Sequence, residues 1–325
     1  MRLGKILTKL IKKPAGLIGL LLLIFFAAIA VLAPVIAPVP DDSHDPQMMP
    51  KFGISTLPET PSEEHPFGTT NKQNDNFYGV VWGTRSALRV GVGITLVTTI
   101  MGMVIGSISA FFGSRADEII MRITDLFQSL PYLMTAIILT SVLQLFYERG
   151  EGIMLTASKI LALFTFGHPY NVIMNPIQVR FVSGMIAIIM FGWMAPARIT
   201  RGNVLKEMNK EYTLAAKTIG AKRPRILFRH LLPNAIFPVL VSAFMSIGTN
   251  VLAFATLGFL GVVAEPGYSD WGQMIRFARD WIPSLDLYPH IIIYPCIAIA
   301  LFILSWNLVG DALRDILDPR TSKLN

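Results

Sequence analysis

The sequence predicts an all-α integral membrane protein with six transmembrane helices. Of its 325 residues, 53% are hydrophobic and 15% are charged, and the mean hydropathy is +0.54. Soluble domains carry about 25% charged residues. Six charge-free stretches interrupt the chain, and crossing a bilayer as a helix takes about 20 residues. The single cysteine excludes a disulfide framework and a CxxC metal or redox site within the chain.

The six stretches define the expected spans in order. The first is longer than the apolar core of a signal peptide, so we expect a permanent N-terminal helix. The fourth has 17 residues, the lower limit for a span. The fifth has 34 residues with several prolines and glycines, so we expect a helix that ends inside it and continues as irregular buried backbone. The stretches are residues 14–40, 90–114, 126–147, 181–197, 231–264 and 287–310.

The basic residues predict the orientation of these spans. With the N-terminus inside, 19 of the 28 lysines and arginines lie on the inner side, so both termini are expected in the cytoplasm. The net charge of +7 then follows from topology and does not indicate nucleic-acid binding. Residues 152–167 resemble a seventh span, but they carry Lys159 at the centre. A span there would also reverse the orientation of every later span. We expect an interfacial or external amphipathic helix there.

The basic segment after the fourth stretch carries the most local information. Residues 214–219 are compatible with a helix, and Gly220 lies where a helix end favours a left-handed residue. Pro224 suits the first turn of a second helix. Paired alanines, Ala215 and Ala216, make one side of the first helix narrow, so a groove in another protein could approach its backbone. A basic loop that binds anionic lipid headgroups is the alternative.

Several motifs then resemble one known family. Glu211 to Asn234, EYTLAAKTIGAKRPRILFRHLLPN, resembles the cytoplasmic "EAA" loop of ABC-importer permeases of the peptide/nickel (oligopeptide and dipeptide) family. Leu214 stands where that family usually has glutamate. The resemblance to the C-type subunit covers nearly the whole chain. Its other motifs are HPFGT at 65–69, the spaced Asp117, Arg122, Asp125 and Pro131, LGFLG at 257–261 and NLVGDALRDILDPR at 307–320.

The resemblance implies an N-terminal cytoplasmic segment and first helix (1–40), an extracellular loop (41–87) and a MetI-like core of five helices (88–325). An external insert (146–182) and a cytoplasmic coupling loop (198–230) lie within the core. The chain would form half of a heterodimeric pore in the plasma membrane. Its partners would be a second homologous permease, two ABC ATPase subunits and an extracellular or periplasmic solute-binding protein.

The same resemblance implies a non-catalytic subunit. The chain has no G-x-x-x-x-G-K-[ST] phosphate loop, so ATP and Mg would be bound by the partner ATPases, and the chain itself would bind no cofactor or metal. The implied coupling helix lies in a cleft of an ATPase. The residues assigned to it are Glu211, Tyr212, Leu214, Ala215, Ala216, Lys217, Gly220, Ala221 and Arg225.

Two further sets of charged residues are interpreted as structural bridges on the cytoplasmic side. Arg122 and Asp125 have i,i+3 spacing, which suits an ion pair on a helix, and an unpaired charge in lipid is costly. Asp311, Arg314 and Asp315 near the end of the sixth helix are expected to form a bridge to the coupling region.

The substrate stays open at this point. The resemblance implies peptides, with oligosaccharides as the alternative and nickel after them, because the departures from the family pattern lie in the external segments 71–77 and 146–182. A self-sufficient secondary transporter would need no ATPase and usually shows inverted repeats, which we do not find. A membrane-embedded enzyme would need clusters of His, Glu or Ser in the spans, and these are almost absent.

Overall fold

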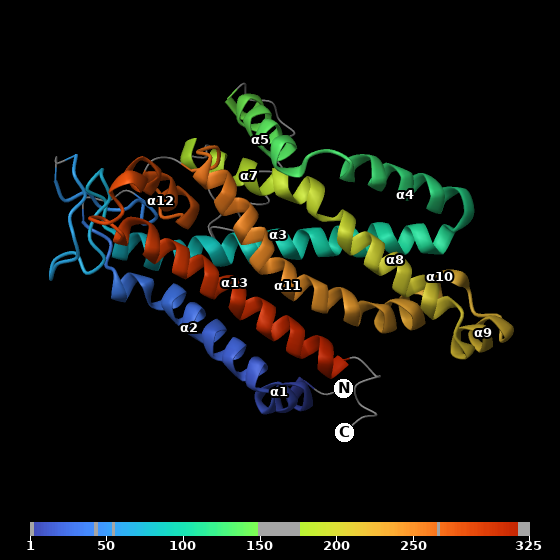
Figure 1. Cartoon of the computed structure of the whole chain (residues 1–325). Helices are drawn as coiled ribbons and strands as arrows, with labels where there is room; N and C mark the ends of the chain where they lie inside the picture. The colour runs from blue at the N-terminus through green and yellow to red at the C-terminus, as the bar shows by residue number, and fades with distance from the viewer. Residues whose placement is uncertain (1–2, 42–44, 54–55, 149–175, 265–266, 318–325) are drawn as a thin grey trace.

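The computed structural model describes residues 3–41, 45–53, 56–148, 176–264 and 267–317, and these ranges consist mostly of helices. The long helices form an elongated bundle with α12 at one end and α9 at the other (Figure 1). Five helices are long and apolar enough to cross a membrane, and one bent pair brings the number to six. The prediction of an all-α, multi-pass membrane protein is confirmed.

The long helices are α2 (Pro14–Ile36), α3 (Asn76–Phe112), α4 (Ser114–Gln128), α5 (Tyr132–Glu148), α7 (Pro176–Gly192), α8 (Met194–Met208), α11 (Leu232–Phe259) and α13 (His290–Leu317). The short elements are α1 (Leu3–Lys12), α9 (Glu211–Thr218), α10 (Arg223–Ile226), the π-helix η1 (Leu227–Leu231), α12 (Trp271–Ala278) and the 3₁₀-helix η2 (Arg279–Ser284). The segment expected to be an amphipathic helix, 152–167, lies outside the described residues.

Helix α3 is the centre of the bundle and packs against α2, α7, α8, α11 and α13. Its closest contact is with α8, where glycines face the partner backbone. A Cβ atom at Gly102 would lie 2.5 Å from the Cβ of Pro196, and one at Gly106 would clash with the carbonyl oxygen of Ala197. Helices in lipid associate by close van der Waals packing, which small residues permit. The α3–α8 contact therefore requires glycine at these positions.

Helix α3 begins at Asn76, well before the charge-free stretch that starts at residue 90. The expected boundary between residues 87 and 88 therefore falls inside this helix. The Asp75 carboxylate accepts a hydrogen bond from the Tyr78 N–H at 2.9 Å and caps the first turn. Arg85, within the extra turns, lies over the Trp82 ring. Charge-free runs indicate where a helix meets lipid and do not indicate where its backbone hydrogen bonds begin.

The third expected span, 126–147, is not one straight helix. It straddles a sharp bend between α4 and α5, whose axes meet at 89°. Pro131 lies at the break. It has no N–H to donate, and its ring disfavours helical backbone at the preceding residue, Leu130. The prediction of a single continuous helix is wrong here, because the apolar run does not reveal the change of direction.

The other spans agree more closely with the sequence. Helices α7 and α8 together give an apolar helical segment, Val179–Met208, so the short fourth stretch belongs to a helix of 30 residues. Helix α11 ends at Phe259, inside the fifth stretch, and Gly261 follows with a φ of 79°. The expectation that this helix stops within the apolar run is confirmed.

The polar segment before α3 is held at the α12 end of the bundle. Its main chain forms a bridge between Met48 and Tyr268, on the segment that leads into α12. The buried His65 Nδ1 lies 2.9 Å from the Asp75 carboxylate that caps α3. Residues far apart in the sequence therefore close this end of the bundle together.

We expect Gly106→Ala to destabilise the fold, because the added methyl group would meet Ala197 and Thr200 on α8. Overpacking of this kind costs about 1–3 kcal/mol. The matched control is Gly202→Ala, where no atom lies within 4 Å of the added Cβ and alanine favours a helix by about 1 kcal/mol. Thermal unfolding of the purified chain should show a lower midpoint for the first variant only. Equal midpoints would contradict the requirement for glycine.

Candidate functional site

A buried glutamate at the end of α8 holds the start of α9. The Glu207 carboxylate lies 2.6 Å from Lys210 Nζ through one oxygen and accepts a hydrogen bond from the Tyr212 hydroxyl at 2.6 Å through the other. Its main-chain carbonyl accepts a hydrogen bond from the Thr213 hydroxyl at 2.8 Å. Asn234, on α11, donates to the Tyr212 hydroxyl at 3.4 Å. These contacts connect α9 to α8 directly and to α11 through Tyr212.

The environment of Glu207 favours the protonated form of both donors. The hydrogen bond to Glu207 raises the pKa of the Lys210 ammonium group. Burial, followed by the hydrogen bond to Glu207, raises the pKa of the Tyr212 hydroxyl. Both groups are protonated at neutral pH at their ordinary pKa values, and the upward shifts extend this protonated range to higher pH.

Helix α9 has one buried side and one exposed side. Thr213 and Ala216 face the bundle, and Ala216 packs in an apolar cluster with Ile226 and Leu227. Ile219, directly after the helix, is 84% exposed. The exposed side also includes Glu211, Leu214, Ala215, Lys217 and Thr218. From the sequence, Ala215 and Ala216 are both expected to face another protein. In the structure only Ala215 is exposed, and Ala216 is buried.

Gly220 ends α9 in the way the sequence predicts. Its φ is 78°, and its N–H donates to the Lys217 carbonyl at 3.0 Å. The next N–H, of Ala221, donates to the Ala216 carbonyl at 3.1 Å. This pair of hydrogen bonds is the Schellman motif, which a left-handed residue makes possible. No atom lies within 4 Å of a Cβ built at Gly220, so glycine is needed there for its backbone conformation and not for space.

The chain returns to the bundle through a second short helix, as predicted. Helix α10 has Pro224 in its first turn and continues through η1 into α11. The Leu232 N–H donates to the Leu227 carbonyl, five residues back, and Pro233 has no N–H to donate. π-Helical turns within α-helices are often found at functional sites. Here the π-helical turn connects the α9 region to the long helix α11.

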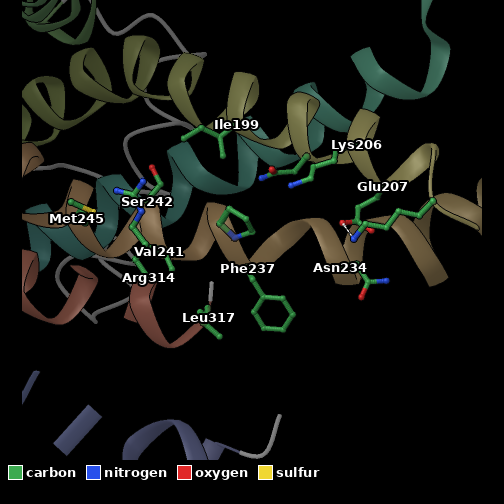
Figure 2. Close-up of a pocket in the computed structure, with 13 residues that line it drawn as sticks. Ile199, Lys206, Glu207, Asn234, Phe237, Val241, Ser242, Met245, Arg314 and Leu317 are labelled. Carbon is green, nitrogen blue, oxygen red and sulfur yellow. Dashed lines mark hydrogen bonds and ion pairs between the residues drawn. The ribbon is translucent and has the colours of Figure 1, made fainter. Parts of the chain in front are cut away.

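A cavity of about 620 Å³ lies beside this region, between α8, α11 and the end of α13. Figure 2 shows Lys206, Glu207 and Asn234 at one end and Arg314 at the other, with Phe237 between them. The lining is thus charged and polar at the Glu207 end, whereas Arg314 lies among apolar side chains such as Val241 and Met245. Among the described residues, no group of three or more His, Cys, Asp or Glu side chains is placed to hold a metal ion.

The expected ion pair between Arg122 and Asp125 does not form. Arg122 Nη2 lies 2.6 Å from a carboxylate oxygen of Glu118, one turn earlier on α4, and Asp125 pairs with Arg198 on α8. Helix α4 follows α3 after the turn at Gly113 and contacts α8, so Asp125 meets Arg198. Arg122 finds its partner on α4 itself. Both residues still take part in ion pairs, and Asp125 connects two helices.

Asp117 makes a second connection between the same helices. Arg201 Nε lies 2.5 Å from Asp117 Oδ1, and Arg201 Nη2 lies 2.5 Å from Asp117 Oδ2. The Ser109 hydroxyl on α3 donates to the same carboxylate. A bidentate arginine–carboxylate pair fixes orientation as well as distance. It therefore joins α3, α4 and α8 near Gly113, where α3 ends and α4 begins.

The charged residues near the end of α13 have different neighbours. Asp315 lies 2.8 Å from Lys13, so it connects α13 to the junction of α1 and α2. Arg314 lines the cavity together with Glu207 and Lys210. Asp311 is exposed on α13. The bridge to the coupling region stays a prediction, and the pair with Lys13 reflects the packing of α13 against α1 and α2 at this end.

Comparison with known proteins identifies the family. Residues 102–323 match the family model described as "Binding-protein-dependent transport system inner membrane component". The chain belongs to this family. A second model, the "N-terminal TM domain of oligopeptide transport permease C", matches residues 3–53. The resemblance to ABC-importer permeases of the peptide type is therefore confirmed, and the alternative of a self-sufficient secondary transporter loses its support.

Curated relatives align with this permease over almost its full length. The oligopeptide transport system permease protein OppC of Bacillus subtilis is 32% identical over 313 residues, which are 95% of this chain and 86% of the relative. The dipeptide permease DppC of Alkalihalophilus pseudofirmus is 30% identical over 95% of this chain and 87% of the relative. The glutathione permease GsiD of Pectobacterium atrosepticum is 32% identical over 94% of this chain and 86% of the relative.

Several residues of this site, Lys210 and Asn234 among them, were absent from the set predicted from the sequence. Glu207 and Thr213 form the attachment of α9, and Ile219 is its most exposed apolar side chain. Glu207 precedes the "EAA" motif, and nothing in its spacing indicates a hydrogen bond to Tyr212. The sequence does contain a signal for Ile219, which directly precedes the helix-ending Gly220. An apolar side chain at the tip of a basic loop is unusual and could have indicated a contact with a partner.

We expect Glu207→Ala in the permease to loosen α9, because Lys210 and the Tyr212 hydroxyl would both lose their acceptor. Losing a hydrogen bond to a charged group costs about 1.5–3 kcal/mol. Hydrogen–deuterium exchange of residues 211–218 should therefore become faster, while exchange in α3 stays unchanged. The exposed Glu211→Ala serves as the control. If both variants exchange alike, Glu207 does not hold this helix.

Proposed function

We propose that the chain is one half of a heterodimeric pore in an ATP-driven peptide importer, with α9 as the helix that receives the motion of an ATPase. The observation that carries this proposal is the combination of a fixed base and a free face on α9. Glu207 and Ala216 attach the helix to the bundle, while Leu214, Ala215 and Ile219 are exposed on the other side. The resemblance of this loop to the "EAA" motif supports the same role.

The partners follow from this role. Two ABC ATPases that bind ATP and Mg would bind the α9 end, a second homologous permease would complete the pore, and a solute-binding protein would deliver substrate at the α12 end. The distribution of basic residues supports a cytoplasmic location for α9 and both termini. Residues 198–230 would then form the cytoplasmic coupling loop, and the segment before α3 would be external.

The contacts of α9 suggest how ATP-driven closure would reach the pore. A force on the exposed side of α9 passes through Glu207 and Tyr212 to α8 and α11, because both helices hold the same hydrogen-bonded group. Ala216 packs against Ile226 and Leu227, so α10 and η1 move with α9. Such motion changes transport only if ATP and the loaded binding protein each bind one of the two pore conformations more tightly.

The substrate class rests on the relatives. Those described above carry oligopeptides, dipeptides or glutathione according to their names, which supports peptides for this chain. Oligosaccharides and nickel remain the alternatives from the sequence, so they belong in the test. Peptide, oligosaccharide and nickel pools can each be loaded on the cognate solute-binding protein.

We expect Ile219→Asp to reduce ATPase coupling about tenfold or more, because an apolar anchor at the centre of an interface contributes at least about 2 kcal/mol. The side chain is 84% exposed, so the substitution should leave the fold intact. The assay is substrate-stimulated ATP hydrolysis in liposomes by the complete transporter. Ile219→Leu, which keeps a large apolar side chain at the same position, is the control.

Stimulation by the peptide pool alone, lost in Ile219→Asp and kept in Ile219→Leu, supports the proposal. Stimulation by oligosaccharides or nickel alone would overturn the substrate class but not the coupling role. Full co-purification with the ATPases and unchanged stimulation in Ile219→Asp would overturn the coupling role of this face.

A further inference from the structure

Helix α1 is amphipathic along its whole length. In a helix of this sequence, LGKILTKLIK, Ile6, Leu7, Leu10 and Ile11 fall on one side, whereas Thr8, Lys9 and Lys12 fall on the other. The helix contains no acidic residue. This pattern is typical of helices that lie in the plane of a membrane surface.

Only part of the apolar side is covered by the protein. Leu10 is 4% exposed and packs with Val309 and Ala312 on α13. Leu7 is 50% exposed and Ile11 is 45% exposed, although both belong to the same apolar side. The bundle therefore fixes the rotation of α1 and leaves two large apolar side chains facing outward.

The junction with α2 fixes the direction of α1. Lys13 has extended backbone, with a φ of −93° and a ψ of 126°, which breaks the helix at one residue. Its ammonium group lies 2.8 Å from Asp315 on α13. Figure 1 shows α1 turned away from the line of α2, beside the end of α13. The bend and the ion pair hold α1 across the end of a membrane-spanning helix.

The position of α2 places this exposed pair at a membrane boundary. Helix α2 is long and apolar enough to span a bilayer, and side chains such as Ile18, Leu21 and Val31 are exposed on it. An exposed apolar surface on a helix of this length suits contact with lipid. Since only Lys13 separates the two helices, Leu7 and Ile11 lie at the depth where α2 enters the bilayer.

We propose that α1 is an in-plane anchor that binds an anionic lipid surface. Lys9 and Lys12 would contact anionic headgroups while Leu7 and Ile11 insert among the acyl chains. Both lysines are exposed, and within the described ranges neither makes a hydrogen bond or an ion pair. Each lysine near an anionic surface contributes about fivefold to binding. Because α1 is joined to α13 through Leu10 and Lys13, the lipid surface would also position the end of α13.

The test uses the full chain reconstituted in vesicles of phosphatidylcholine with or without phosphatidylglycerol. Cys296→Ser removes the single native cysteine. A nitroxide label is then placed at Leu7→Cys or at Thr8→Cys, on the two opposite sides of α1. Power-saturation electron paramagnetic resonance compares access of oxygen, which concentrates in lipid, with access of a water-soluble nickel complex. A label at Val31→Cys, which is 76% exposed on α2, reports correct insertion.

With phosphatidylglycerol present, the label at position 7 should favour oxygen and the label at position 8 should favour the nickel complex. Lys9→Gln with Lys12→Gln should raise the phosphatidylglycerol fraction needed for this difference several-fold, and the control Lys51→Gln should not. Equal access of the nickel complex at both positions would overturn the anchor. Low access of both reagents at position 7 would indicate a protein partner and overturn it as well. If the label at position 7 favours oxygen equally with and without phosphatidylglycerol, the proposed requirement for anionic lipid is overturned.

Discussion

The arrangement of the bundle depends on how closely α3 approaches α8. Apolar side chains are as well solvated by lipid tails as by one another, so the hydrophobic effect alone does not bring two helices together inside a bilayer. Gly102 and Gly106 remove the side chains that would separate α3 from the backbone around Ala197. The Asp117–Arg201 pair then fixes α4 beside the same contact. A change in the distance between α3 and α8 would thus displace most of the bundle.

The α9 region combines rigidity and exposure in a way that suits the transmission of force. Its hydrogen bonds reach α8 and α11 by way of Glu207 and Tyr212, and its Schellman ending at Gly220 uses hydrogen bonds of the main chain. The exposed side chains of α9 are not needed to hold the helix in place, because Thr213 and Ala216 make its packing contacts with the bundle. A partner can therefore bind the exposed side of α9 without competing with the contacts that hold it.

The two ends of the bundle are stabilised by different physical interactions. At the α12 end, buried polar groups such as His65 and Asp75 satisfy one another, and Asp75 also caps α3. At the α9 end, charged side chains connect helices through ion pairs such as Asp125–Arg198 and Lys13–Asp315. An exposed ion pair contributes at most about 1 kcal/mol. These exposed pairs are therefore weak, whereas the buried Glu207 and the bidentate Asp117–Arg201 pair provide the stronger connections at the α9 end.

The sequence by itself determined the membrane class, the approximate spans and the family, because lipid demands long apolar runs and the "EAA" loop has a specific pattern. It also determined the helix, glycine and helix order around Gly220, since local backbone preferences decide such turns. The tertiary structure alone decided the bend at Pro131, the partners of Arg122 and Asp125, and the role of Glu207. Side chains pair with whatever the packing brings near, and the Asp125–Arg198 pair joins residues 73 positions apart. Spacing along one helix cannot reveal such a partner.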